Sequence, residues 1–209
     1  ACANGSSELM SNLSASVVSI LFNLQLMAII GEAGVAAYSV MMYIDFAFAA
    51  VFLGFSMGSG PIVSFHFGAD NRKELNNVFR KSFAVIALAS LAMVVLSELL
   101  AQPLASAFVG YSPELLELTV HGFRLFALSY FFVGFGIYGS AFFTALCNGP
   151  VSALISFLRT FLFRGGMVLL LPLVLDLDGI WLAVVVADGI GAAVALGLTW
   201  KYRTRYHYL

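Results

Sequence analysis

Charged side chains are scarce in this 209-residue sequence, and their scarcity identifies the solvent in which the chain folds. Asp, Glu, Lys and Arg together make up 10% of the residues, hydrophobic residues make up 61%, and the mean hydropathy is +0.98. Soluble domains carry about 25% charged residues. A chain of this length cannot bury so much apolar surface in water, so the composition excludes a soluble domain and predicts an integral membrane protein.

The patterns that support catalysis are also missing. The histidines have no metal-ligand spacing, the serines have no Lys or His at the spacing of a protease, and no glycine-rich phosphate loop is present. The net charge of -1, with scattered basic residues, gives no nucleic-acid footprint. We therefore expect no enzymatic activity, no catalytic residues, no cofactor, no metal site and no nucleic-acid partner.

Six apolar stretches are each long enough to cross the hydrocarbon core of a bilayer, which takes about 20 helical residues. Lipid offers no partners to backbone polar groups, and the alternation of a membrane barrel is absent, so these stretches must be helices. Gln102-Pro103 predicts the end of the third, and residues 104–120 suit a short helix at the membrane surface. The predicted fold is all-α, a polytopic membrane protein with one six-helix bundle over residues 1–209 and spans at 8–30, 35–65, 83–100, 123–146, 151–175 and 180–200.

Basic residues accumulate in cytoplasmic loops, and their distribution predicts the orientation of the chain. With the amino terminus inside, the loop 72–81 and the tail 201–205 hold seven basic residues on the cytoplasmic side, whereas the outer loops hold mainly Asp and Glu. We predict a multi-pass protein of the inner (plasma) membrane with both termini cytoplasmic. Trp181 and Trp200, at the two ends of the last span, suit interfacial anchors.

Two acidic residues inside the predicted spans are candidates for coupling to an ion, because charges are costly in the membrane and mark function. Asp45 lies about ten residues into its span, which at about 1.5 Å per residue places it near the midplane. Its alternative role is a structural carboxylate bonded to a neighbouring helix. For Asp188 the structural role is favoured, because Gly189 and Gly191 beside it indicate tight helix packing.

Five other polar residues in the spans are candidates for lining a cavity. Asn23, Gln25 and Tyr43 are placed to offer hydrogen bonds to Asp45. Arg159 and Arg164 are five residues apart, which on an α-helix does not place them on one line. We interpret the two arginines mainly as topology determinants that extend to the inner interface, with a cavity-lining role as the alternative.

Three segments resemble a known family of transporters. They are GEAGVAAY at 31–38, GFSMGSGPIVSFHFGADN at 54–71 before a basic loop, and DGIWLA at 178–183 with an acid further on. The chain resembles the second six-helix half of multidrug and toxic compound extrusion (MATE) transporters. The resemblance implies the carboxy-terminal lobe of a secondary active efflux transporter, which exchanges protons or sodium ions for cationic or amphipathic organic compounds by alternating access.

Several alternatives stay open beside this interpretation. Residues 11–19 hold no acid, whereas some family members carry a cation ligand in that helix, so coupling is left to Asp45 or to an acid in the other half. The other half is either part of a longer chain or a second copy of this one. A lipid-linked sugar flippase of the same superfamily would need several cations in its cavity. A non-transporting membrane subunit would need tight packing and fully paired membrane acids.

Overall fold

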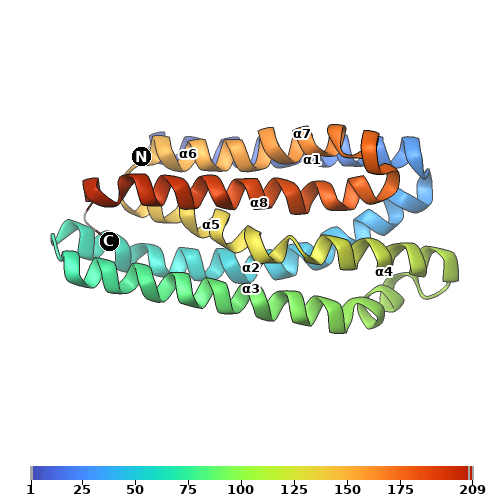
Figure 1. Ribbon diagram of the computed structural model, residues 1–209, viewed down its shortest axis with the longest axis horizontal. Coiled ribbons are helices and arrows are strands. Elements are labelled where there is room, and N and C mark those ends of the chain that lie inside the picture. Colours follow the sequence, from blue (N-terminus) through green and yellow to red (C-terminus); the bar gives the residue numbers. More distant parts are fainter. Residues whose placement is uncertain (1, 207, 209) are drawn as a thin grey trace.

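The computed structural model describes residues 2–206 and 208, with side chains from residue 12 onward. The described chain is helical throughout and holds no strand, which confirms the all-α prediction. Figure 1 shows long helices running side by side. Five of these helices are long and apolar enough to cross a bilayer, or six when the pair formed by α4 and α5, bent by 51°, counts as one broken span. The protein is therefore a multi-pass membrane bundle.

The helices follow one another with only short breaks. In the part of the chain that the structure describes, every element is an α-helix apart from a π-helix, η1, in the middle of the fifth span. Their bounds are α1 Cys2–Ile29, α2 Glu32–Gly68, α3 Arg72–Val109, α4 Pro113–Ala127, α5 Tyr130–Ala145, α6 Gly149–Phe157, η1 Leu158–Arg164, α7 Gly165–Leu170 and α8 Pro172–Tyr206.

Polar side chains at the turns set where several helices begin. Asn71, Ser112 and Asn148 each accept a hydrogen bond from the backbone N–H three residues later, which satisfies a donor that the helix start leaves free. Gly31 joins α1 to α2 with a φ of 84°, a conformation that glycine adopts without strain. These local signals keep the connections short and leave the polar turns at the two ends of the bundle.

The third helix differs from the sequence prediction. The predicted stop at Gln102-Pro103 is wrong, since α3 runs through Pro103 to Val109, and no separate helix covers 104–120. Ala105 and Val109 are buried at 1% and 3% exposure, and they hold the final turns of α3 on the bundle. Their packing outweighs the one backbone hydrogen bond that Pro103 cannot make.

The fourth span is bent rather than continuous. The sequence predicts one helix over 123–146, but α4 ends at Ala127 and α5 begins at Tyr130. Between them the N–H groups of Leu128 and Ser129 donate to carbonyls three residues earlier, which tightens the chain and turns its axis. Phe126 and Tyr130 are fully buried on either side of the bend, so the change of direction lets both rings enter the core.

The last two spans meet where the sequence predicts. α8 is bounded at Pro172, but Asp176 interrupts it with a φ of 47°, so residues 172–175 continue the fifth span and the sixth begins after this break. The following turn packs back on the chain so closely that a Cβ at Gly179 would lie 2.5 Å from the carbonyl oxygen of Leu171. A side chain at that position would therefore prevent the turn.

Trp181 is not the interfacial anchor that its position suggests. It is fully buried, and its indole packs against α4, where a Cβ at Gly122 would lie 2.8 Å from the ring. Trp200 at the other end of α8 is 62% exposed, with the guanidinium of Arg203 stacked over its ring. Only the second tryptophan is in a position to meet the membrane interface.

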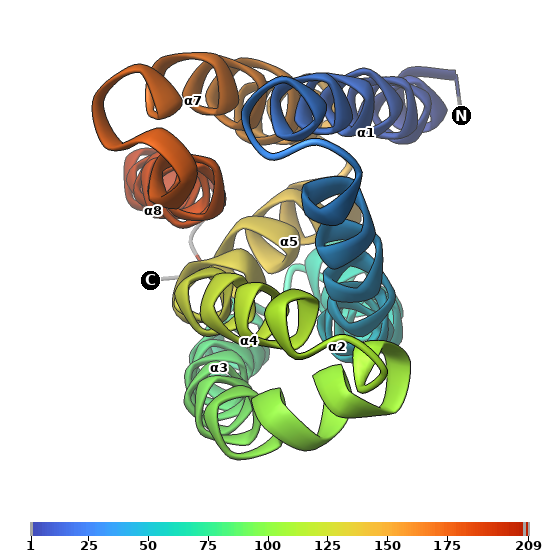
Figure 2. The same cartoon turned by 90° about the vertical axis from the view of Figure 1, so that its right-hand side faces the viewer.

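Helix α5 lies at the centre of the bundle (Figure 2), in contact with α2, α3, α6 and α8. Glycines allow this close approach: a Cβ at Gly134 would lie 2.7 Å from the ring of Phe52, and one at Gly139 would lie 3.0 Å from Ala195. By contrast, a Cβ added at either glycine of the Gly54-x-x-x-Gly58 motif of α2 would have no atom within 4 Å. The motif therefore makes no helix contact within the described chain.

The two ends of the bundle differ in charge. Both chain ends lie at one end, together with the turns from α2 to α3 and from α5 to α6 (Figure 1). The basic residues of 72–81 and 201–205 gather there, whereas Glu32, Glu114, Glu117, Asp176 and Asp178 lie at the opposite end. This arrangement separates the charges along the bundle axis in the way that the sequence predicts.

Candidate functional site

A paired arginine and aspartate lie in the interior of the bundle. Arg164 donates two hydrogen bonds to Asp188, from Nε to Oδ1 at 3.1 Å and from a terminal nitrogen to Oδ2 at 2.6 Å. The Asp188 side chain is fully buried, and that of Arg164 is 20% exposed. This two-pronged geometry is the strongest form of an ion pair between side chains. It joins η1 to α8 and satisfies a carboxylate that lipid cannot solvate.

The π-helix explains why Arg164 turns inward. Residues five apart are one turn apart in a π-helix, because its hydrogen bonds join residue i to residue i+5. Arg159 and Arg164, which an α-helix would separate, are thereby brought to the same side of η1, and both lie in the electrostatic field of Asp188. The interpretation of Arg164 as a residue that extends to the inner interface is therefore wrong, since it binds Asp188 inside the bundle.

Arg159 is held in place by two glycines. A Cβ at Gly136 of α5 would lie 2.7 Å from Cδ of Arg159, and one at Gly191 of α8 would lie 2.8 Å from its Cγ. The side chain thus passes through a gap that only glycine leaves open. Its Nε is buried and has no hydrogen-bond partner. Arg159 is therefore a closely packed cation whose Nε has no hydrogen-bond partner among the described residues.

Asp45 completes what we call the charged cluster, formed by Asp45, Arg159, Arg164 and Asp188. The field at Asp45 comes from the other three members. Unlike Asp188, it makes no ion pair with any of the residues described. The hydroxyl of Tyr130 on α5 lies beside its carboxyl and is itself buried without a hydrogen-bond partner. Asp45 is therefore a partly buried membrane acid that has no ion pair among the described residues.

A cavity of about 560 Å³ opens between α1, α2, α5, α6 and η1, and we call it the hydroxyl cavity. Among the described residues, its walls combine hydroxyl groups, one amide, apolar side chains and one charged side chain. The lining residues are Asn12, Leu53, Ser56, Met57, Gly60, Ser64, Ile137, Ser140, Ala141, Thr144, Ala145, Ser152, Ser156 and Arg159. Its volume is within the range of about 300–1,000 Å³ typical of sites for small molecules.

Hydroxyl groups from two helices form a connected network along this cavity. Ser140 on α5 lies 2.9 Å from the hydroxyl of Ser152 and 2.8 Å from that of Ser156, both on α6. Thr144 lies 2.7 Å from the same Ser152 hydroxyl. Across the cavity, the Ser56 hydroxyl on α2 is buried and has no partner. The cavity wall can thus donate and accept hydrogen bonds at several points.

The structure separates the predicted cavity-lining residues. Arg159 lines the hydroxyl cavity, but Asn23, Gln25, Tyr43 and Arg164 are not among the residues around it. Asn23 donates to the carbonyl of Ser19 on its own helix rather than to Asp45. Tyr43 is 71% exposed. Gln25 is partly buried, with no hydrogen bond among those found for the described side chains.

The hydroxyl network was not among the predicted site residues, although the sequence carries a signal for it. Ser140 and Thr144 are four residues apart, as are Ser152 and Ser156, so each pair lies on one face of an otherwise apolar helix. The antiparallel packing of α5 on α6 brings the two faces together. Polar pairs at this spacing in two consecutive spans therefore indicate a shared polar surface.

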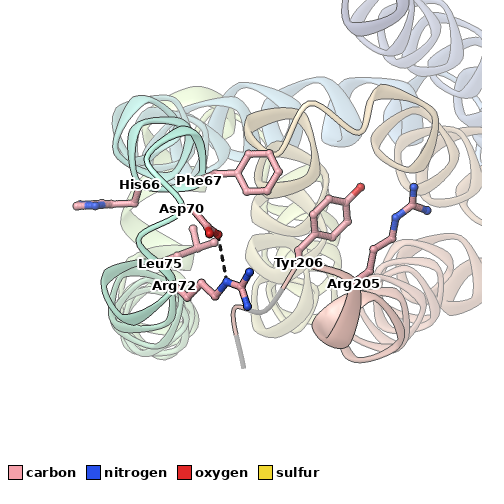
Figure 3. A pocket seen from close by; sticks show the side chains of 7 residues that line it. All are labelled: His66, Phe67, Asp70, Arg72, Leu75, Arg205 and Tyr206. Atoms are coloured by element: carbon pink, nitrogen blue, oxygen red, sulfur yellow. Dashed lines mark hydrogen bonds and ion pairs between the residues drawn. The ribbon is translucent and has the colours of Figure 1, made fainter.

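A second, smaller pocket of about 240 Å³ lies at the basic end of the bundle, between the α2–α3 turn and the end of α8. Figure 3 shows Arg72 bound to Asp70, while His66 and Arg205 point away from one another. The Asp70 and Arg72 side chains are 79% and 55% exposed. An exposed pair of this kind satisfies its own charges, so this pocket offers no concentrated site for a ligand.

The comparison with protein families agrees with this architecture. The model of the family described as MatE matches residues 9–166. The chain belongs to the MatE family. None of the curated proteins compared with the sequence matches it.

Solved MATE structures share the fold of this chain. A crystal structure of a MATE protein in complex with MaL6 superposes on 99% of the chain with a TM-score of 0.91 and 21% identity. An outward-facing multidrug resistance MATE transporter gives 0.90 at 21% identity over 98% of the chain, and an inward-facing one gives 0.87 at 20% over 95%. The chain spans 46–47% of the length of these three structures, which is about half.

The ion pair yields a prediction about stability. Breaking a buried pair by removing one partner costs about 3–5 kcal/mol, whereas replacing both partners by apolar residues is often neutral. We expect Arg164→Met and Asp188→Val each to lower the free energy of unfolding by about this amount, and the double variant to recover most of the loss. Denaturant unfolding of the full-length protein in detergent micelles measures all three.

Arg124→Gln is the matched control for these variants. Arg124 lies 3.6 Å from Glu98, but both side chains are about half exposed, so this pair contributes at most about 1 kcal/mol. A double variant as unstable as the sum of the two single variants would contradict the assignment of Arg164 and Asp188 as one interacting pair.

Proposed function

We propose that this chain forms one half of a secondary active transporter that moves small amphipathic organic compounds across the membrane by alternating access. The other half, in the same chain or in a second copy, completes the substrate passage. Membership of the MatE family and the half-length match to MATE structures support this proposal. The observation that carries it is a cavity between the spans with hydroxyl groups and Arg159 in its wall, together with a membrane acid, Asp45, that has no ion pair among the described residues.

This observation separates a transporter from a non-transporting membrane subunit. A purely structural subunit would pack tightly and pair all its membrane acids, because an open polar surface or a free carboxylate destabilises a bundle in lipid. Here the hydroxyl cavity opens between α1, α2, α5 and α6, and Asp45 makes no ion pair among the described residues. Both features favour transport.

A lipid-linked sugar flippase is supported less well. Such a protein must neutralise the several negative charges of a diphosphate, which calls for several cations in one cavity. Of the two arginines available in the spans, Arg164 is committed to Asp188, and only Arg159 lines the hydroxyl cavity. A single arginine suits a ligand with a single acidic or polar head.

Alternating access needs a lobe that keeps its internal fold while its position changes. The chain matches both an outward-facing and an inward-facing MATE structure, with TM-scores of 0.90 and 0.87. Similar agreement with both states supports movement of this half largely as one body. The ion pair between η1 and α8 and the glycine contacts of α5 supply the stiffness that such movement requires.

Asp45 is the proposed coupling group, for protons or sodium ions. Asp188 is fixed by two hydrogen bonds to Arg164, so its loss of charge would break the pair, whereas Asp45 can bind or release a cation without breaking an ion pair. Neutralising Asp45 also changes the charge balance around Arg159 and Arg164, which links cation binding on α2 to the charges of η1. The identity of the coupling ion and the direction of exchange both depend on the role proposed here for Asp45.

We expect Asp45→Asn to keep folding and membrane insertion intact but to abolish gradient-driven efflux. The substitution preserves shape and hydrogen bonding while it removes the titrating charge, so substrate binding is partly retained. Efflux from proteoliposomes that contain the full-length protein, measured with separate proton and sodium gradients, tests this and identifies the ion. Transport like that of the parent protein at every pH would mean that Asp45 is structural.

Asp176→Asn is the matched control for this experiment. Asp176 lies in the exposed turn that interrupts α8, and Asn has the same size and branching as Asp, so the substitution places no larger side chain in this turn. The substitution Asp176→Asn makes the same chemical change as Asp45→Asn, but outside the charged cluster. We expect this variant to transport normally, so that a loss confined to Asp45→Asn identifies the effect of position rather than of net charge.

The basic end of the bundle is proposed to face the cytoplasm of a cell whose inner (plasma) membrane holds the protein. In a protein with Cys2 and Cys147 replaced by serine, Lys73→Cys should be protected from membrane-impermeant maleimides in intact cells, and Glu114→Cys should react with them. Both positions are exposed and lie at opposite ends of the bundle, so each controls for the other. The reverse labelling pattern would contradict the orientation.

A further inference from the structure

We propose that the hydroxyl cavity binds the acidic head group of an amphipathic organic anion, a carboxylate or sulfonate carried on an apolar body. This inference names the class of substrate for the proposed transporter. Its biological meaning rests on the proposed function, but the binding itself does not. The binding itself follows from Arg159, the hydroxyl network and the apolar wall, each of which recognises a different part of such a molecule.

The charged cluster leaves Arg159 available to a ligand. It contains two arginines and two aspartates, but Arg164 and Asp188 neutralise each other through two hydrogen bonds. Among the described residues, Arg159 makes no ion pair, its Nε has no hydrogen-bond partner, and it is the one charged residue around the hydroxyl cavity. Asp45 contributes to the field at Arg159 but does not line the cavity. A ligand in the cavity therefore meets a cation with unused donors.

Hydroxyl groups extend this donor surface. Ser152 and Ser156, at 1% and 7% exposure, reach the same network as Ser140 on the opposite helix. The Ser56 hydroxyl, at 3% exposure, faces the cavity with no partner at all. A hydroxyl rotates to donate wherever an acceptor lies. Guanidinium and hydroxyl donors around one space form the chemistry that binds oxygen atoms of an anion.

The remaining wall is apolar and fits the body of the ligand. Leu53 and Met57 on α2 face the cavity together with Ile137, Ala141 and Ala145 on α5. Burial of apolar surface on such a wall contributes about 25 cal/mol per Å² of area removed from water. The hydroxyl cavity thus combines a polar, cationic region with an apolar one, and the volume of about 560 Å³ accepts a molecule of drug size.

The same lining disfavours a cationic head group, in contrast to the substrate expected from the family resemblance. No Asp or Glu is among the residues that surround the hydroxyl cavity in the described chain. Among the described residues around the cavity, an organic cation would meet Arg159, which repels it, and no carboxylate that compensates. Arg159 cannot turn away easily, because Gly136 and Gly191 hold its side chain between α5 and α8.

The binding test uses two fluorescent probes that share one apolar body. Dansyl-taurine carries a sulfonate, and dansylamidoethyl-trimethylammonium carries a quaternary ammonium in its place. The full-length protein, in nanodiscs of zwitterionic lipid, is titrated with each probe at equilibrium, without any ion gradient. We expect saturable binding of the sulfonate and binding of the ammonium that is at least about tenfold weaker, because the interactions of a charged ligand group of this kind are worth about 1.5–3 kcal/mol.

Arg159→Met should weaken binding of the sulfonate by at least about tenfold and leave that of the ammonium unchanged or improved. Ser156→Ala, which removes one hydroxyl and little volume, should weaken binding of the sulfonate by about fivefold. Arg124→Gln, an equal loss of charge far from the cavity, should have no effect. Gly136→Ala should also weaken binding of the sulfonate, since the added methyl group would displace the Arg159 side chain from a contact of 2.7 Å.

Several results would overturn the proposal. One is equal binding of the two probes; another is sulfonate binding that Arg159→Met and Ser156→Ala both leave unchanged in protein that unfolds like the parent. Nanodiscs with added phosphatidylglycerol identify the source of the anion. If phosphatidylglycerol displaces the sulfonate probe, and this displacement depends on Arg159, the site binds a lipid phosphate. If the lipid displaces no probe, the site binds a soluble anion. Because no transport is measured, failure of the efflux experiment alone would leave this binding result intact.

Discussion

A charge buried among membrane helices must find its partner inside the protein, and the pair formed by Arg164 and Asp188 is the clearest consequence of this constraint. The fully buried carboxylate of α8 accepts two hydrogen bonds from one guanidinium. That guanidinium reaches α8 from the π-helix, whose wider turn brings Arg159 and Arg164 to the same side. The local distortion of the fifth span is thus stabilised by the ion pair, and the register of η1, α7 and α8 follows from it.

The pairing also divides the charged cluster into committed and available groups. Arg164 and Asp188 neutralise one another, which leaves Asp45 and Arg159 without ion pairs in the described chain. The two are differently placed, since Arg159 lines the hydroxyl cavity and Asp45 lies outside it, next to Tyr130. In the proposed function, cation exchange at Asp45, which is in electrostatic reach of the arginine that lines the cavity, would link ion binding to substrate binding.

The sequence predicts the all-helical membrane class, because hydropathy and the demand for internal hydrogen bonds act locally. It does not predict features that depend on tertiary partners. Pro103 fails to stop α3 because Ala105 and Val109 are buried, and Trp181 leaves the interface because Gly122 opens a place for it. The inward turn of Arg164 depends on Asp188, which is 24 residues away in the chain. The hydroxyl network is predictable only in part. The four-residue spacing of its members can be read from the sequence, but the packing of α5 on α6 is what brings the two pairs together.

The central claim is that Asp188 is bound in an ion pair whereas Asp45 is not, among the residues described. Infrared difference spectroscopy of the full-length protein across a pH step tests this difference most directly. A carboxyl group that gains a proton shows a C=O stretching band, which identifies it without any transport. We expect such a band in the parent protein and in Asp176→Asn, and its loss in Asp45→Asn, because Asp188 is bound to Arg164 by two hydrogen bonds whereas Asp45 has no ion pair among the described residues. A band that persists unchanged in Asp45→Asn would show that another acid titrates, and would contradict the division of roles within the charged cluster.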